Sequence, residues 1–222
     1  YEVVLVSSGA IAVGRNKLNM TAKPDSMRMK QAAAAVGQCS LMYLYDKFFG
    51  DYDKTVAQIL LNAEDIEQEE KKENLINTFN ALLEMGVIPI VNENDSVSYK
   101  EIESEDRLFG DNDMLSAVVA VLCRAKHLVI FSDIDGFYDH DPRLYPNAQL
   151  IDQIDTIDDS VYALAGGAGS RRGTGGMRTK LQAASLATSQ GTNTIVTNGK
   201  RPEVLYDIIK GGKAGTLFPG KI

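Results

Sequence analysis

Short runs of aliphatic and β-branched residues alternate with longer amphipathic segments along most of the chain. Apolar runs of about four to eight residues are typical of buried strands, whereas apolar positions that recur every three or four residues are typical of helices. The runs predict strands at residues 2–6, 54–61, 87–91, 127–132, 193–197 and 215–218. The helical patterns predict helices at residues 9–18, 26–49, 65–85, 113–124, 176–190 and 202–210.

This alternation predicts the fold class. Strands that alternate with helices are usually parallel, and the helices then cover both faces of the sheet. The sequence therefore predicts an α/β fold, a three-layer α/β/α sandwich with a central, mostly parallel sheet. Ligands of such sheets bind beyond the carboxyl ends of the strands, so the loops that follow the strands are the candidate site.

Composition narrows the function classes. The 222 residues are 44% hydrophobic and 24% charged, as expected for one globular domain. The net charge of -7 argues against nucleic acid as a partner, because phosphate backbones are held by clustered lysine and arginine. No apolar run approaches the roughly 18 residues of a membrane helix, and no signal peptide opens the chain. Two cysteines without a CxxC pair give no disulfide or zinc framework, so we expect a cytoplasmic protein.

A glycine-rich segment at residues 170–180 runs into a predicted helix and places a lysine in its first turn. Glycines let backbone N–H groups approach an anion, and a helix start adds unpaired donors and partial positive charge. The segment favours phosphate binding, although many helices begin after such a turn for geometric reasons alone. The phosphate-binding candidate is this whole segment, Ser170 to Lys180, which includes Thr174, Gly175, Gly176, Met177, Arg178, Thr179 and Lys180.

Four further polar loops follow predicted strands or open a predicted helix, at residues 7–10, 92–95, 110–113 and 132–138. Each alone is explained by helix capping or turn chemistry. Together they are predicted to meet at one edge of one sheet. Carboxylates beside a phosphate loop would repel a nucleotide unless they bound a cation, oriented a lysine or recognised a substrate ammonium, which suggests phosphoryl transfer. The P-loop, GxGxxG and protein-kinase motifs are absent.

These loops, together with residues 141–143, 173–180 and 215–218, resemble in order and spacing the bacterial glutamate 5-kinase family of the amino acid kinase superfamily. The resemblance covers nearly the whole chain. It implies ATP-dependent phosphorylation of the side-chain carboxylate of L-glutamate to L-glutamyl 5-phosphate, the first step of proline biosynthesis. It also implies ATP and Mg²⁺ as cofactors, and we name no protein ligand for the metal.

The resemblance assigns glutamate binding to a set of small and polar residues. Asp95 would accept the substrate ammonium, and side-chain amides, a hydroxyl and backbone N–H groups would bind the carboxylates. The glutamate-binding candidates are Ser8, Gly9, Ala10, Asn92, Asp95 and Asn112.

The same resemblance assigns nucleotide binding to Ser132, Asp133 and residues 174–180. Lys180 is the candidate that neutralises charge on the transferred phosphoryl group. Asp113 resembles the family aspartate that orients the catalytic lysines. Its other interpretation is a carboxylate favoured by the dipole at a helix start.

Three departures from the family pattern stand out. Relatives begin with a strand and a lysine-bearing phosphate loop, and the chain opens after that unit, so we expect it to lack that N-terminal segment. Many relatives carry a C-terminal PUA domain, which is not expected in this single domain of residues 1–222. Arg178 stands where relatives often have serine, and could contact phosphate or face solvent.

Other readings remain open. The chain could be another superfamily kinase, acting on N-acetylglutamate, aspartate, carbamate or UMP, or a non-catalytic ligand sensor. The resemblance implies a homo-oligomer, a dimer or tetramer, for which the apolar helix at residues 26–49 offers a surface unless that face packs in the core. It also implies L-proline as a feedback inhibitor, with residues 96–109 as the segment of interest.

Overall fold

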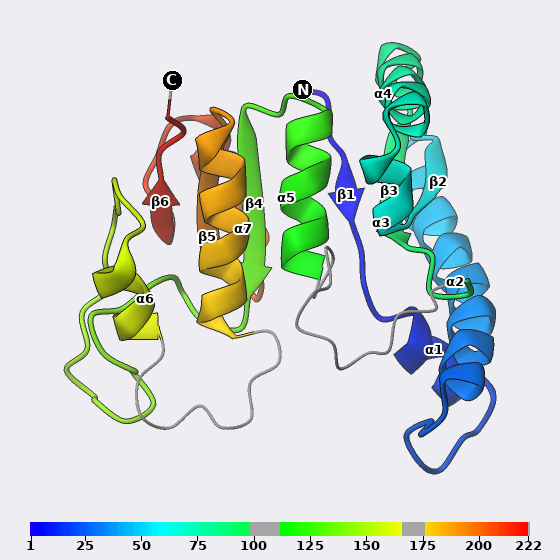
Figure 1. Ribbon diagram of the computed structural model, residues 1–222, viewed down its shortest axis with the longest axis horizontal. Helices are drawn as coiled ribbons and strands as arrows, with labels where there is room; N and C mark the ends of the chain where they lie inside the picture. Colours follow the sequence, from blue (N-terminus) through cyan, green and yellow to red (C-terminus); the bar gives the residue numbers. More distant parts are fainter. Residues whose placement is uncertain (98–111, 166–175, 222) are drawn as a thin grey trace. The chain divides into compact units, whose positions relative to one another are not determined.

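The computed structural model describes residues 1–97, 112–165 and 176–221. The chain divides into two compact units, residues 1–115 and 116–222, whose boundary lies within α5 (Asn112–Leu122). Each unit contains a three-stranded sheet with helices packed against it (Figure 1). The α/β class and the parallel pairing of most strands are confirmed.

The sheet of the first unit has the order β1 (Leu5–Val6), β3 (Ile88–Glu93), β2 (Val56–Leu61), and all pairs are parallel. Val6 pairs with Val91, and Leu61 pairs with Glu93. The three strands therefore end at the same edge, and the polar residues that follow β1 and β3 begin there.

Two helices of this unit, α1 (Ala10–Lys17) and α2 (Met27–Gly50), cross at very close range. The crossing is built from small residues: a methyl group at Gly14 would collide with the carbonyl of Ala33, and one at Gly37 with the carbonyl of Ala10. Helices with larger side chains at the contact are held about 8–10 Å apart. The small residues thus fix the position of α1, which begins at the sheet edge.

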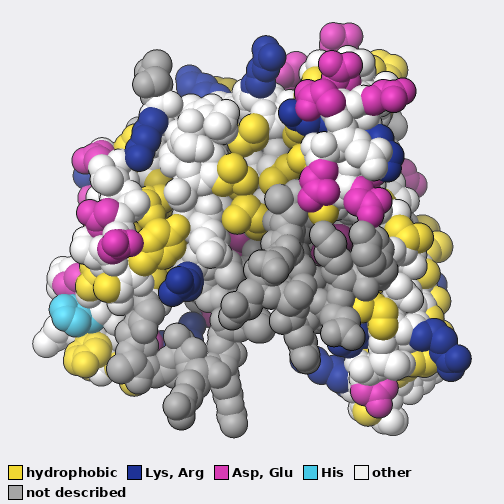
Figure 2. Space-filling view, in the orientation of Figure 1, with side chains coloured by type: hydrophobic (Ala, Val, Ile, Leu, Met, Phe, Trp, Pro, Cys, Tyr) yellow, Lys and Arg dark blue, Asp and Glu magenta, His cyan; other side chains and the backbone are white. Residues whose placement is uncertain are grey.

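The helix predicted at residues 65–85 is two helices, α3 (Ala63–Glu67) and α4 (Glu69–Glu84), separated by an extended Gln68. The Asp65 carboxylate accepts a 2.8 Å hydrogen bond from the N–H of Asn62 and caps α3. The break gives the acidic stretch two helix starts, where carboxylates are favoured by the dipole. Figure 2 shows acidic side chains gathered over this part of the unit.

The sheet of the second unit has the order β4 (His127–Ser132), β5 (Asn193–Asn198), β6 (Thr216–Phe218). β4 and β5 are parallel, with Ser132 opposite Asn198, and β6 runs antiparallel at the edge. Leu181, Val196 and Phe218 lie in its hydrophobic core.

The helices of the second unit include α7 (Met177–Ser189), packed against β5, and α8 (Val204–Ile209). The helix α6 (Asp159–Ala165) was not predicted from the sequence. The signal was present in Asp158, whose carboxylate accepts hydrogen bonds from the N–H groups of Ser160 and Val161 and so caps the first turn. The Ser160 hydroxyl donates a further hydrogen bond to the same carboxylate. This bond, and after it the bonds from the two N–H groups, lower the pKa of Asp158.

The described strands pair as two sheets of three, one in each unit, and most of the pairs are parallel, as predicted. Hydrophobic periodicity shows which segments are extended but not which strand pairs with which, so the strand order within each sheet was not predicted. The organisation of residues 1–222 as one domain stays a prediction. In the part of the chain that the structure describes, no helix is long and apolar enough to cross a membrane.

Candidate functional site

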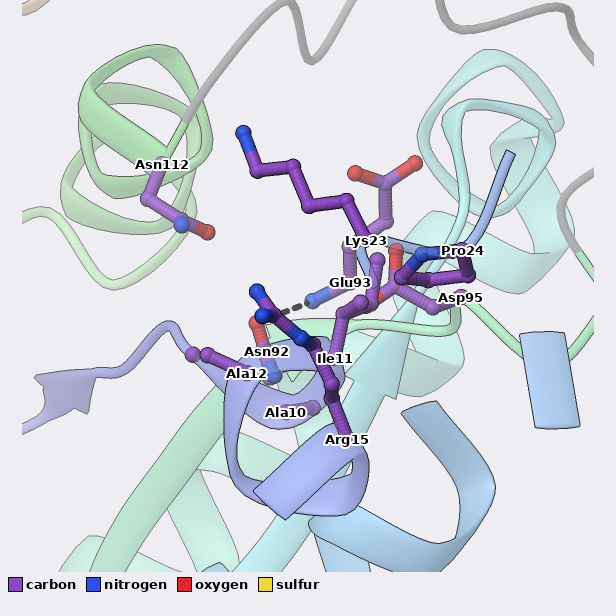
Figure 3. Close-up of a pocket in the computed structure, with 11 residues that line it drawn as sticks. Ala10, Ile11, Ala12, Arg15, Lys23, Pro24, Asn92, Glu93, Asp95 and Asn112 are labelled. Atoms are coloured by element: carbon purple, nitrogen blue, oxygen red, sulfur yellow. Dashed lines mark hydrogen bonds between the residues drawn. The ribbon is translucent and has the colours of Figure 1, made fainter. Parts of the chain in front are cut away.

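A pocket of about 330 Å³ opens in the first unit at the carboxyl edge of its sheet. Its size lies within the range of small-molecule sites. Segments distant in the sequence build it: the start of α1, the loop before α2, the end of β3 and the start of α5 (Figure 3). The lining residues are Gly9, Ala10, Ile11, Ala12, Arg15, Lys23, Pro24, Asn92, Glu93, Asp95 and Asn112.

The wall at α1 is formed by backbone. Gly9 has a φ of 94°, a left-handed conformation that turns the chain from β1 into the helix and that glycine adopts without strain. No side chain caps this helix start, so its first N–H groups are available to an anion at the wall. Ser8, predicted as a glutamate ligand, is exposed and is not among the lining residues.

The wall at β3 is polar and partly buried. Asn92 is 3% exposed, and its amide donates a 3.0 Å hydrogen bond to the side-chain carbonyl of Gln38 on α2. Its own carbonyl accepts a 2.9 Å bond from the N–H of Glu93. Asn92 therefore holds the end of β3 against α2, while Asp95, half-buried, lines the pocket two residues after Glu93, where β3 ends.

Two cations that were not predicted from the sequence, Arg15 and Lys23, also line this pocket. Arg15 lies four residues after Ile11 and therefore on the same face of α1, a spacing that could have placed it there. Lys23 lies in an irregular loop, whose course no periodicity predicts. Gln38 was missed as well, because only the packing of α2 brings it to Asn92.

The nucleotide candidates lie in the second unit. Ser132 ends β4, and Asp133 follows it with an ion pair of 3.6 Å to Arg143. Beside them, Asp135 accepts a 2.7 Å hydrogen bond from the amide of Asn198, at the end of β5. The Tyr138 hydroxyl donates a 3.2 Å hydrogen bond to the same carboxylate. The pKa of Tyr138 is raised, first by desolvation and then by the negative charge of Asp135. These bonds tie together the loops that leave β4 and β5.

The start of α7 carries the other phosphate candidates. Gly176 precedes the helix without a side-chain cap, and the Thr179 hydroxyl donates a 2.9 Å bond to its carbonyl. Lys180 is half-buried in the first turn. Arg178 is exposed and lies over the ring of Tyr162 on α6, with 5.9 Å from its guanidinium carbon to the ring centre. Thr174 and Gly175 lie outside the described residues.

The structure thus brings together Gly9, Ala10, Asn92, Asp95 and Asn112, five of the six predicted glutamate ligands. Asp113 follows Asn112 in the first turn of α5, and is half-buried. Ser132 and Asp133 lie at the carboxyl edge of the second sheet. Among residues 1–97, 112–165 and 176–221 no group of three or more acidic, histidine or cysteine side chains could hold a metal ion.

A model of the amino acid kinase family matches residues 1–198. The chain belongs to this family. Among curated relatives, this amino acid kinase is 54% identical over 220 residues to the glutamate 5-kinase of Clostridium perfringens, covering 99% of the chain and 81% of the relative. It is 49% identical over 220 residues to the glutamate 5-kinase of Listeria monocytogenes EGD-e, covering 99% and 79%. The resemblance found from the motifs is confirmed.

Solved structures agree on the fold. The amino acid kinase superposes on the carbamate kinase of Giardia lamblia bound to AMP-PNP with a TM-score of 0.63 and 17% identity, covering 99% of this chain and 85% of the other. The isopentenyl phosphate kinase of T. acidophilum gives a TM-score of 0.60 and 17% identity, covering 97% and 83%.

Proposed function

We propose that this amino acid kinase transfers the terminal phosphoryl group of ATP to the side-chain carboxylate of L-glutamate, giving L-glutamyl 5-phosphate and ADP. The observation that best supports this substrate is the pocket of the first unit, which is lined by a carboxylate, amides, cations and the start of α1, where the structure shows no side-chain cap. A free amino dicarboxylate needs this mixture, because it brings one ammonium and two carboxylates. The identity of about half of all residues with two glutamate 5-kinases supports the same substrate.

Asp95 accepts the substrate ammonium in this proposal, and the start of α1 at Gly9 and Ala10 binds a carboxylate through N–H groups. Asn112 supplies an amide from the start of α5. Asn92 is a positioning residue, since both ends of its side chain already bond to protein and hold β3 in place.

The donor set of the second unit fits a nucleotide. The start of α7 after Gly176, which has no side-chain cap in the structure and is followed by a lysine in the first turn, can bind phosphate oxygens. Ser132 and Asp133 are assigned to the rest of the nucleotide. When bound, ATP with Mg²⁺ supplies the phosphoryl group and masks part of its charge. Lys180 neutralises charge that grows on the transferred group, and Asp113 orients the lysine side chains.

Replacing Asp95 by asparagine is expected to raise the KM for glutamate about 10- to 150-fold and to leave the KM for ATP nearly unchanged. The change removes the charge opposite the ammonium, and a charge-assisted hydrogen bond contributes about 1.5–3 kcal/mol. Steady-state kinetics that follow ADP release, with the acyl phosphate trapped as hydroxamate, measure both constants.

Glu93→Gln is the matched control, since Glu93 is the other carboxylate lining the pocket. The assignment of Asp95 is wrong if Glu93→Gln has the larger effect, or if Asp95→Asn weakens both substrates equally. N-acetylglutamate, which lacks the ammonium, should be a poor substrate of the unaltered enzyme. Glutamate binding without any turnover would instead make the protein a ligand sensor.

Feedback inhibition by L-proline follows from the same proposal. If proline competes for the glutamate pocket, raising glutamate should restore activity, and substitutions within residues 96–109 should change the proline inhibition constant more than the KM for glutamate. Most of this segment lies outside the described residues. Inhibition that glutamate cannot reverse would place proline at a separate site. Assembly into a dimer or tetramer and a cytoplasmic location stay predictions.

A further inference from the structure

Arg15 lines the glutamate pocket but has no acidic partner in the described part of the chain. Its Nε donates to the carbonyl of Met20 at 3.4 Å and its Nη2 to the carbonyl of Thr21 at 3.5 Å. Both bonds are long, and they use two of the five N–H groups of a guanidinium. No ion pair is formed with a described carboxylate, although Glu93 and Asp95 line the same pocket.

The backbone fixes where this guanidinium lies. Arg15 is in the last turn of α1, and long helical side chains lean back toward the helix start, which here is the pocket wall. Figure 3 shows the side chain extending among the lining residues. The carbonyls of Met20 and Thr21 hold it from the loop that also carries Lys23 and Pro24 into the pocket, so less side-chain freedom is lost when an anion binds.

Resting on the proposed function, we infer that Arg15 binds the α-carboxylate of glutamate and makes the enzyme selective for amino acids that carry it. A planar guanidinium matches the two oxygens of a carboxylate, and the pair is stronger than contacts from neutral donors. The side-chain carboxylate is the nucleophile, whose lone pairs would be withdrawn by such a bidentate pair. Arg15 therefore binds the α-carboxylate, which does not react and lies beside the ammonium held by Asp95. The N–H groups at the start of α1 bind the side-chain carboxylate, which reacts.

Two analogues separate this role from support of the fold. Glutarate keeps both carboxylates but lacks the ammonium, whereas 4-aminobutanoate keeps the ammonium but lacks the α-carboxylate. Arg15→Gln keeps a neutral donor for the loop carbonyls and removes the charge. We expect the variant to raise the KM for glutamate and the inhibition constant of glutarate about 10- to 150-fold. The inhibition constant of 4-aminobutanoate and the KM for ATP should change less than about threefold.

Lys17→Gln is the matched control, since Lys17 is the other base in the last turn of α1 and its Nζ donates to the Ser40 hydroxyl at 3.0 Å, outside the pocket. Lys23→Gln tests the second cation of the pocket. Arg15→Lys should restore part of the glutamate affinity. The inference is overturned if Arg15→Gln weakens all three ligands alike, or if only Lys23→Gln affects glutamate. Where 4-aminobutanoate binds the unaltered enzyme too weakly to measure, an equal rise in the KM for ATP and glutamate overturns it. An unaltered enzyme that neither binds nor phosphorylates glutamate refutes the proposed function instead.

Discussion

Replacing Lys180 by methionine is expected to lower kcat about 100-fold or more while the KM for glutamate stays nearly unchanged. Lys180 is the fourth residue of α7, half-buried behind the helix start that we assign to phosphate. Charge on the transferred phosphoryl group grows toward the transition state, so a lysine that meets this charge acts on kcat. Loss of a single electrostatic donor costs other enzymes about 100- to 1,000-fold.

Arg178→Met is the matched control for Lys180→Met, because it removes another cation from the same turn and introduces the same residue, methionine. Arg178 is exposed and lies over Tyr162, so its removal should change kcat less than about threefold. Thermal unfolding of both variants checks that any fall in kcat is not caused by unfolding. Near-normal kcat in Lys180→Met, or an equal loss in Arg178→Met, would remove Lys180 from the mechanism.

The sequence predicted long and strongly patterned elements best. β4 was predicted at residues 127–132 and is found there, and α2 was predicted one residue early at each end. The 24 residues of α2 are too many for one strand, whereas the six residues of β4 are too few for a typical helix. β1 spans only Leu5–Val6 within the predicted run of 2–6, because pairing with β3, rather than apolar character, decides where it is a strand.

The features that were not predicted all depend on interactions beyond the hydrophobic pattern of one segment. The break at Gln68 depends on competition between helix starts in an acidic stretch, and α6 depends on a single capping carboxylate. The strand order within each sheet depends on pairing between segments distant in the sequence. Periodicity within one segment contains none of this information.

The site shows the same limit. Asn92 and Asp95 were predicted from the family resemblance, on a polar loop that follows the strand predicted at residues 87–91, and both line the pocket. Arg15 and Lys23 were missed because basic residues on helices and loops are usually solvated, and only the three-dimensional arrangement shows them lining a pocket. Ser8 was predicted with its neighbours and is exposed and not among the lining residues, so its role as a glutamate ligand stays a prediction.

Replacing Gly37 by alanine is expected to destabilise the protein by about 3 kcal/mol or more, lowering Tm by roughly 6–12 °C. The added methyl would collide with the backbone carbonyl of Ala10 and crowd the backbone of Gly14, so no side-chain rotation can relieve it. The helices must separate, and α1 carries Gly9, Ala10 and Arg15 into the pocket. We therefore expect the KM for glutamate to rise together with the loss of stability.

Gly50→Ala is the control for the crossing, since Gly50 ends the same helix α2 and a methyl there meets nothing within 4 Å. Alanine should leave Tm unchanged or raise it slightly, because it reduces the freedom of the unfolded chain. Calorimetric unfolding of both variants with glutamate kinetics at a temperature where each is folded provides the comparison. Gly37→Ala with unchanged Tm would mean that α1 and α2 do not cross at this distance. A lowered Tm with an unchanged KM for glutamate would separate the crossing from the pocket and weaken the assignment of the α1 wall to the substrate.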